Sequence, residues 1–215
     1  KFCFGFESII LERHDRVGGL CTWWERRGFH IDGCVHWLTG THKDTDLYKI
    51  WSNLGVLQDD DNIYIQKVIG VMDYQGEKLT LYADTKKLKE EFLRVGPNDK
   101  RAINRFFKDL RKIVNVPLPL SEPVNTMSFG RLLKTGFRIF PYLFFMARIA
   151  SKSCEKYGKK FKSPILRFFF KQFQPGPGSA YALIYSFGTI VYGNGGIPKK
   201  ASKGIVERMK KSIFH

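Results

Sequence analysis

The sequence predicts an α/β fold made of two chemically different parts. Short apolar runs typical of buried strands alternate with amphipathic helical patterns, and 43% of the 215 residues are hydrophobic, enough for a substantial core. Residues 1–84 hold 9 Lys/Arg and 13 Asp/Glu, a net charge of −4, whereas residues 85–215 hold 27 and 7, a net charge of +20. This division indicates a localised basic surface that meets something anionic.

The first part begins with a predicted buried strand. Residues 8–11 read Ser-Ile-Ile-Leu, a run typical of a parallel strand covered on both faces. Because one such strand cannot form a sheet alone and the first residue is Lys1, we expect the chain to be an internal piece of a longer protein. Extended segments at 22–26 and 29–32 follow, and then a helix over 44–54 with Asp44 as a candidate N-cap.

The second part is predicted to be mainly helical. A hairpin is expected over 62–84 with its turn near Gln75-Gly76, and its first arm starts at Ile63. Apolar spacing then predicts helices over 85–95, 99–114, 178–192 and 203–213.

The stretch 127–173 is unusually basic and aromatic. It holds 11 Lys/Arg against one acid, Glu155, and many phenylalanines. Its longest uncharged run, 139–147, is too short for a membrane-spanning helix, which needs about 20 apolar residues. Either the phenylalanines form the core of a helical domain with a basic rim, or they dip into an anionic membrane surface. Base stacking in nucleic acid is disfavoured because the phenylalanines cluster with Leu, Ile and Met.

Cysteines and histidines do not form a recognisable metal site or disulfide scaffold. The four cysteines are Cys3, Cys21, Cys34 and Cys154, and no two of them form a Cys-x-x-Cys pair. The spacing of the other candidate ligands, His30, His36 and His42, matches no known zinc site. We therefore expect no metal and reduced thiols in a cytosolic compartment.

A carboxylate followed by paired glycines carries the strongest chemical signal. A strand-end acid such as Glu12 can accept hydrogen bonds from an adenosine ribose. Residues 12–22 read Glu-Arg-His-Asp-Arg-Val-Gly-Gly-Leu-Cys-Thr, which resembles the second flavin-binding signature of the amine oxidase and phytoene desaturase superfamily. Side chains at Gly18 and Gly19 would block the approach of backbone amides to a pyrophosphate.

The resemblance continues along the chain. Residues 23–40 read Trp-Trp-Glu-Arg-Arg-Gly-Phe-His-Ile-Asp-Gly-Cys-Val-His-Trp-Leu-Thr-Gly. This string is similar to the phytoene dehydrogenase-related branch, which includes carotenoid desaturases, carotenoid cis–trans isomerases and retinol saturases. Residues 192–198 occupy the place where that family returns from its substrate domain to its flavin domain.

The resemblance implies a partial doubly wound, Rossmann-like FAD-binding domain with an inserted α+β substrate domain. Residues 1–55 would be the first part of the FAD domain, 56–192 the substrate and membrane-facing domain, and 193–215 the return. The family's N-terminal phosphate loop and C-terminal flavin segment are absent from the chain, so we expect these residues alone to be inactive and to aggregate.

Residue roles also follow from the resemblance. FAD would be bound by Glu12 at the ribose, Arg13 near the adenine, and Gly18, Gly19 and Leu20 at the pyrophosphate and flavin. Thr22 and the segment from Gly33 to Gly40 would approach the isoalloxazine ring. His36 would face the reaction chamber as the candidate catalytic residue.

The implied activity is FAD-dependent desaturation or saturation of a hydrophobic polyene or isoprenoid-type lipid by hydride transfer at flavin N5. The alternative within enzymes is a redox-neutral cis–trans isomerase that uses reduced flavin. The alternative of another class is a non-catalytic, membrane-binding piece of a flavoprotein. Expected partners are the lipid substrate and an anionic membrane through 127–173, with cytoplasmic, peripherally membrane-associated localisation and no nucleic acid.

Overall fold

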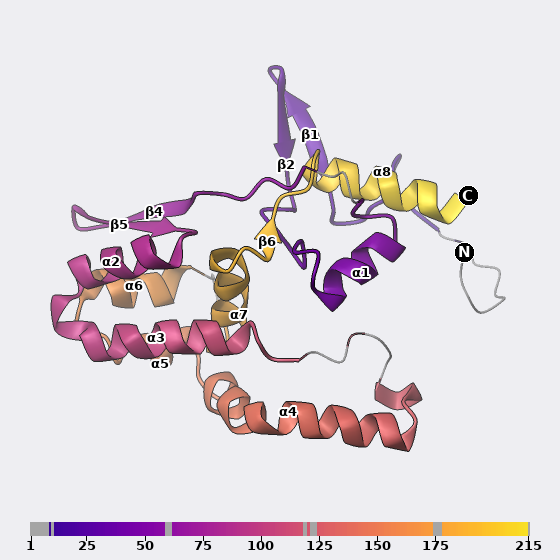
Figure 1. Cartoon of the computed structure of the whole chain (residues 1–215). Coiled ribbons are helices and arrows are strands. Elements are labelled where there is room, and N and C mark those ends of the chain that lie inside the picture. Colours follow the sequence, from indigo (N-terminus) through magenta and orange to yellow (C-terminus); the bar gives the residue numbers. More distant parts are fainter. Residues whose placement is uncertain are drawn as a thin grey trace. The chain divides into compact units, whose positions relative to one another are not determined.

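The computed structural model describes residues 9, 11–58, 62–117, 120, 124–173 and 178–214 (Figure 1). The chain divides into two compact units. Unit 1 comprises Lys1–Ile65 and Gly195–His215, and unit 2 comprises Gln66–Asn194.

Unit 1 contains a hairpin built from the two extended segments that the sequence predicts. Strands β1 (Trp23–Arg26) and β2 (Phe29–Asp32) pair antiparallel. Arg27 and Gly28 form the turn with φ angles of 51° and 77°, the left-handed conformation that tight hairpin turns require.

A second pairing in unit 1 joins distant parts of the chain. Strand β3 (Leu38–Thr39) pairs antiparallel with β6 (Gly195–Gly196). The buried N–H of Gly196 donates to Oγ1 of Thr41 at 3.0 Å. Gly196 leaves no room for a Cβ atom, which would collide with the side chain of Ile63.

Helices α1 (Asp46–Asn53) and α8 (Ala201–Phe214) confirm the two helices predicted in this unit. The N-cap of α1 is Thr45 rather than Asp44, because Oγ1 of Thr45 accepts the N–H of Tyr48 at 3.2 Å. Four buried apolar residues of unit 1 form a small core: Tyr48, Val56, Leu57 and Ile205.

The strand expected over residues 8–11 falls mostly outside the described residues. Of this segment, Ile9 and Leu11 are described; they lie outside any strand and are 89% and 90% exposed. All strand pairs in the described part of the chain are antiparallel. The doubly wound parallel sheet therefore stays a prediction.

Unit 2 begins with the predicted hairpin. Strands β4 (Val68–Tyr74) and β5 (Glu77–Tyr82) pair antiparallel, and Gln75 and Gly76 form the turn with positive φ angles. The first arm starts at Val68 instead of Ile63, because Ile63 packs against the core of unit 1.

The helices of unit 2 follow the predicted apolar stripes. Helices α2 (Thr85–Val95), α3 (Lys100–Ile113) and α7 (Ala180–Val191) confirm the predictions within two residues at each end. The basic stretch forms α4 (Phe129–Ala150), α5 (Cys154–Gly158) and α6 (Pro164–Gln172). The β4–β5 ribbon packs against α2 and α6 (Figure 1). Fully buried phenylalanines fill the centre: Phe92, Phe106, Phe161, Phe169, Phe170 and Phe187.

One buried polar cluster interrupts this apolar core. The carboxylate of Asp109 accepts hydrogen bonds from Nη2 of Arg148 at 2.7 Å and from the hydroxyl of Tyr157 at 2.8 Å. Burial, followed by the charge of Asp109, raises the pKa of Tyr157, so the phenol stays protonated and donates. The cluster joins α3, α4 and α5 through directional contacts.

Candidate cofactor site

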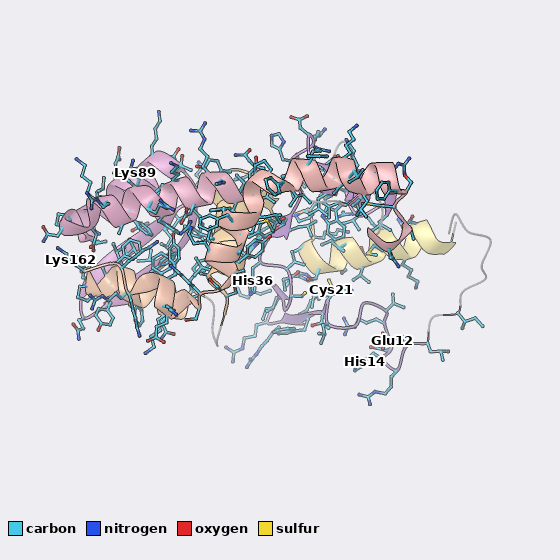
Figure 2. The ribbon with its side chains drawn as sticks, turned by 90° about the horizontal axis from the view of Figure 1, so that it is seen from below. Glu12, His14, Cys21, His36, Lys89 and Lys162 are labelled. Atoms are coloured by element: carbon cyan, nitrogen blue, oxygen red, sulfur yellow. The ribbon has the colours of Figure 1, made fainter. Side chains whose placement is uncertain are left out.

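Glu12 begins the loop that the sequence predicts to bind a cofactor. Its side chain is exposed, and its Oε1 accepts the N–H of His14 at 3.0 Å (Figure 2). This hydrogen bond holds the pKa of Glu12 below its usual range, and the N–H groups of Arg13 and Gly19 act in the same direction. The carboxylate is therefore favoured over the neutral acid, and it belongs to the same loop as the glycine pair.

The two glycines of the loop serve different physical needs. Gly18 and Gly19 have φ angles of 127° and 55°, which side chains disfavour. A Cβ atom on Gly18 would lie 2.9 Å from Cγ2 of Val206, so Gly18 allows the loop to pack closely on α8. A Cβ on Gly19 would meet nothing within 4 Å. Gly19 thus leaves an open face of backbone where a ligand can approach.

A recess of about 160 Å³ lies within this loop. Arg16 lines the recess, and its guanidinium lies 5.4 Å from the ring centre of Trp23. Ligand pockets commonly measure about 300–1,000 Å³. The recess is smaller than that, so it could hold one polar group of a nucleotide cofactor but not the whole cofactor. It is lined by His14, Asp15, Arg16, Val17, Gly19, Cys21, Thr22 and Trp23.

Thr22 and Gly33 are brought together at the end of the hairpin. The N–H of Gly33 donates to the carbonyl of Thr22 at 2.9 Å. A Cβ on Gly33 would lie 2.7 Å from the ring of Trp24, so the close packing of the hairpin requires glycine here. Thr22 lines the recess, whereas Gly33 acts on it through Thr22.

Of the predicted site residues, Gly19 and Thr22 line the recess; the other six lie outside its lining: Glu12, Arg13, Gly18, Leu20, Gly33 and His36. Arg13 is exposed and outside its lining, and Leu20 is 93% exposed. His36 is also exposed, packs loosely near Trp37, and lies apart from Glu12 (Figure 2). The structure therefore brings Gly19 and Thr22 together at the recess, connects Glu12 to it through the N–H of His14, and leaves His36 outside the lining.

Sequence reasoning missed a polar link between the hairpin and α8. The carboxylate of Asp32 accepts the N–H of Ser202 at 2.7 Å and its hydroxyl at 2.6 Å, together with the N–H groups of Cys34 and Val35. Partial burial acts to raise the pKa of Asp32, but these hydrogen bonds outweigh it and lower the pKa. No local pattern could have revealed this pair, which is 170 residues apart.

Helix α4 carries an exposed apolar face. At helical spacing, residues 129, 133, 137, 140 and 144 fall on one side, and the four phenylalanines among them are 72–82% exposed. The opposite side contributes Phe145 and Ile149 to the core. Arg131, Lys134, Arg138 and Arg148 are the charged residues of α4, which contains no acid.

The described residues also bear on metal binding and on membrane spanning. Within the ranges given above, no group of three or more His, Cys, Asp or Glu side chains is placed to hold a metal ion. In the same ranges, every helix is too short or too polar to cross a membrane.

Comparison with known proteins supports a nucleotide-cofactor site. Residues 3–54 match the NAD(P)-binding Rossmann-like domain. The chain is 26% identical over 113 residues to the all-trans-retinol 13,14-reductase of Danio rerio, covering 51% of this chain and 18% of that protein. It is also 26% identical over 145 residues to the inactive all-trans-retinol 13,14-reductase of Danio rerio, covering 63% and 23%. These matches span about a fifth of the relatives' length. The recess thus lies in a segment similar to a nucleotide-binding Rossmann-like domain.

Proposed function

We propose that this chain contributes an FAD site to an oxidoreductase that acts on a hydrophobic polyene or isoprenoid-type lipid. The observation that carries this proposal is the loop in which the carboxylate of Glu12 accepts the N–H of His14 and the backbone of Gly19 stays open. The match of residues 3–54 and the similarity to retinol reductases support a redox cofactor and an isoprenoid-like substrate.

Each residue of the loop has a defined task in this proposal. The carboxylate of Glu12 would accept hydrogen bonds from the ribose, and the open face of Gly19 would admit the pyrophosphate. Thr22 would bound the recess, Arg13 and Leu20 would cover the cofactor from the loop, and His36 would lie near the substrate. When bound, FAD supplies hydride transfer at N5, so no side chain of this chain is needed as an acid or base.

Unit 1 would then form part of the flavin domain and unit 2 the substrate domain. We further propose that α4 attaches the protein to an anionic membrane. Its exposed phenylalanines would enter the bilayer surface, while Arg131, Lys134 and Arg138 would meet headgroups at about 1 kcal/mol each. The fourth cation, Arg148, is held by Asp109. Such attachment suits an enzyme whose substrate dissolves in lipid.

The cofactor proposal is tested by the visible absorption of the protein as its gene encodes it. A flavin spectrum that remains after gel filtration is the expected result. A folded but colourless protein would contradict the proposal and favour the non-catalytic alternative, which the similarity to an inactive relative keeps open. If flavin is bound, consumption of an electron acceptor with a polyene substrate separates desaturation from isomerisation.

The membrane proposal is tested by co-flotation with vesicles. We expect binding to phosphatidylcholine vesicles that contain phosphatidylserine, and weak binding to phosphatidylcholine alone. Phe137→Ser with Phe144→Ser should abolish binding, whereas Phe29→Ser, an equally exposed phenylalanine on β2, should not. If the Phe137→Ser/Phe144→Ser double variant floats with the vesicles as well as Phe29→Ser does, the proposed role of α4 is contradicted.

A further inference from the structure

Two cysteines flank the open end of the β1–β2 hairpin. The N–H of Gly33 donates to the carbonyl of Thr22 at 2.9 Å, one pair beyond the two strands. The N–H of Thr22 donates to the carbonyl of Leu20, so the ladder ends at this pair, and Cys21 and Cys34 are the residues directly before and after it. Extending the register by one more pair would oppose the two cysteines; opposed residues of an antiparallel ladder have Cα atoms about 4.5–5.5 Å apart, which is within the range that a disulfide spans.

A second set of contacts places both cysteines beside Asp32 and Ser202. Sγ of Cys21 lies 3.9 Å from the carbonyl oxygen of Ser202, and the hydroxyl of Ser202 donates to Oδ1 of Asp32 at 2.6 Å. The N–H of Cys34 donates to the same oxygen at 2.9 Å. Burial raises the pKa of Cys21, and the neighbouring Cys34 thiol adds to the rise. Both cysteines therefore border one cluster.

The two thiols differ in access to solvent. Cys34 is exposed and Cys21 is half-buried, whereas Cys154 is buried in the core of unit 2. An exposed thiol reacts first with a reagent in solution, and a partly buried neighbour then attacks the product. In this arrangement Cys34 is the thiol that reacts first, and Cys21 is the resolving thiol.

We propose that Cys21 and Cys34 form an intramolecular disulfide by exchange with a low-molecular-weight disulfide. The thiolate of Cys34 attacks one sulfur of the external disulfide, whose S–S bond breaks and releases one thiolate. The thiolate of Cys21 then attacks Sγ of Cys34, which forms the Cys21–Cys34 bond and expels the second external thiolate. The cysteine pair loses two electrons, the external disulfide gains them, and the two cysteine protons pass to the released thiolates.

The bond would close the base of the hairpin directly after the glycine pair. The N–H of Cys21 donates to the carbonyl of Gly18 at 2.9 Å, so the disulfide would restrain the loop that borders the recess. The inference concerns the thiols alone and does not depend on which cofactor binds.

The experiment uses the protein as its gene encodes it, incubated with oxidised glutathione at neutral pH, quenched with N-ethylmaleimide and mapped by proteolysis and mass spectrometry. In the folded chain we expect the Cys21–Cys34 disulfide to exceed the glutathione adduct of Cys34 by about tenfold, because the partners are held together. In urea this preference should disappear.

Variants make the assignment specific. Cys21→Ser should convert the product into a stable glutathione adduct at Cys34, and Cys154→Ser should change nothing. A folded chain in which Cys34 forms only the glutathione adduct, or pairs with Cys3 or Cys154 instead, would overturn the proposal.

Discussion

The two units are held together in different ways. In the described residues of unit 2, phenylalanines from α2, α3, α6 and α7 stack into one continuous core, with Phe106 and Phe170 centred 5.2 Å apart. In the described residues of unit 1, the core cluster consists of four buried apolar residues, and polar contacts such as Asp32 with Ser202 supplement it. Apolar burial thus specifies unit 2, whereas unit 1 keeps exposed backbone and carboxylates near which a cofactor can bind.

The largest expected effect is in the core of unit 2. Phe106→Ala should lower the free energy of unfolding by about 3–5 kcal/mol, because Phe106 is fully buried among other aromatic rings. Urea unfolding followed by circular dichroism measures this change. A loss below about 1 kcal/mol would show that apolar burial does not dominate in this unit.

A smaller effect is expected at the buried polar cluster. Asp109→Asn keeps the shape of the side chain but removes the charge that faces Arg148 and Tyr157. We expect a loss of about 2–3 kcal/mol in unfolding free energy, since hydrogen bonds to charged groups are being weakened. Glu155→Gln, on the neighbouring exposed surface, is the control and should change stability little.

In unit 1, Asp32 is the carboxylate that corresponds to Asp109, because it accepts hydrogen bonds from another part of the chain. Asp32→Asn should cost about 1–3 kcal/mol, because it weakens the link to Ser202. The folded pKa of Asp32 lies below its ordinary value of 3.8, so its contribution is present above pH 3.8 and is lost as the pH falls through the folded pKa. Below pH 3.8, the unfolding free energy of Asp32→Asn should therefore fall less steeply with decreasing pH than that of the unaltered protein. Asp15→Asn, at an exposed ion pair, should leave the curve unchanged.

The smallest effect on folding is expected on α4. Phe140 is 72% exposed, so Phe140→Ala should change the unfolding free energy by less than about 0.5 kcal/mol, in contrast to Phe106→Ala. A loss comparable to that of Phe106→Ala would mean that this face of α4 is covered in the folded protein.

Local patterns predicted the helices well because each carries its own periodicity. Helix α2 begins and ends at the predicted residues, and the β4–β5 turn lies at Gln75-Gly76 as expected. The boundary at Val68 was missed because residues of high strand propensity recur from Ile63 to Val68, and only tertiary packing separates them.

Contacts between distant segments could not be predicted from one sequence. The pairing of β3 with β6 and the contact of Asp32 with Ser202 depend on how the chain returns after α7. Glu12 and Gly19 were predictable together because they belong to one short motif. The place expected for His36, facing the reaction chamber, stays a prediction; the structure leaves this side chain exposed.

The most direct test of the account is the flavin affinity of Gly19→Ala compared with that of Gly28→Ala, in the protein as its gene encodes it. Both glycines have positive φ and open space beside them, so both variants carry the same backbone strain. We predict that Gly19→Ala weakens FAD binding by about tenfold, which corresponds to about 1.4 kcal/mol. Gly28→Ala should bind FAD as tightly as the unaltered protein does. Equal affinity of the two variants would contradict a cofactor site at the Glu12–Gly19 loop.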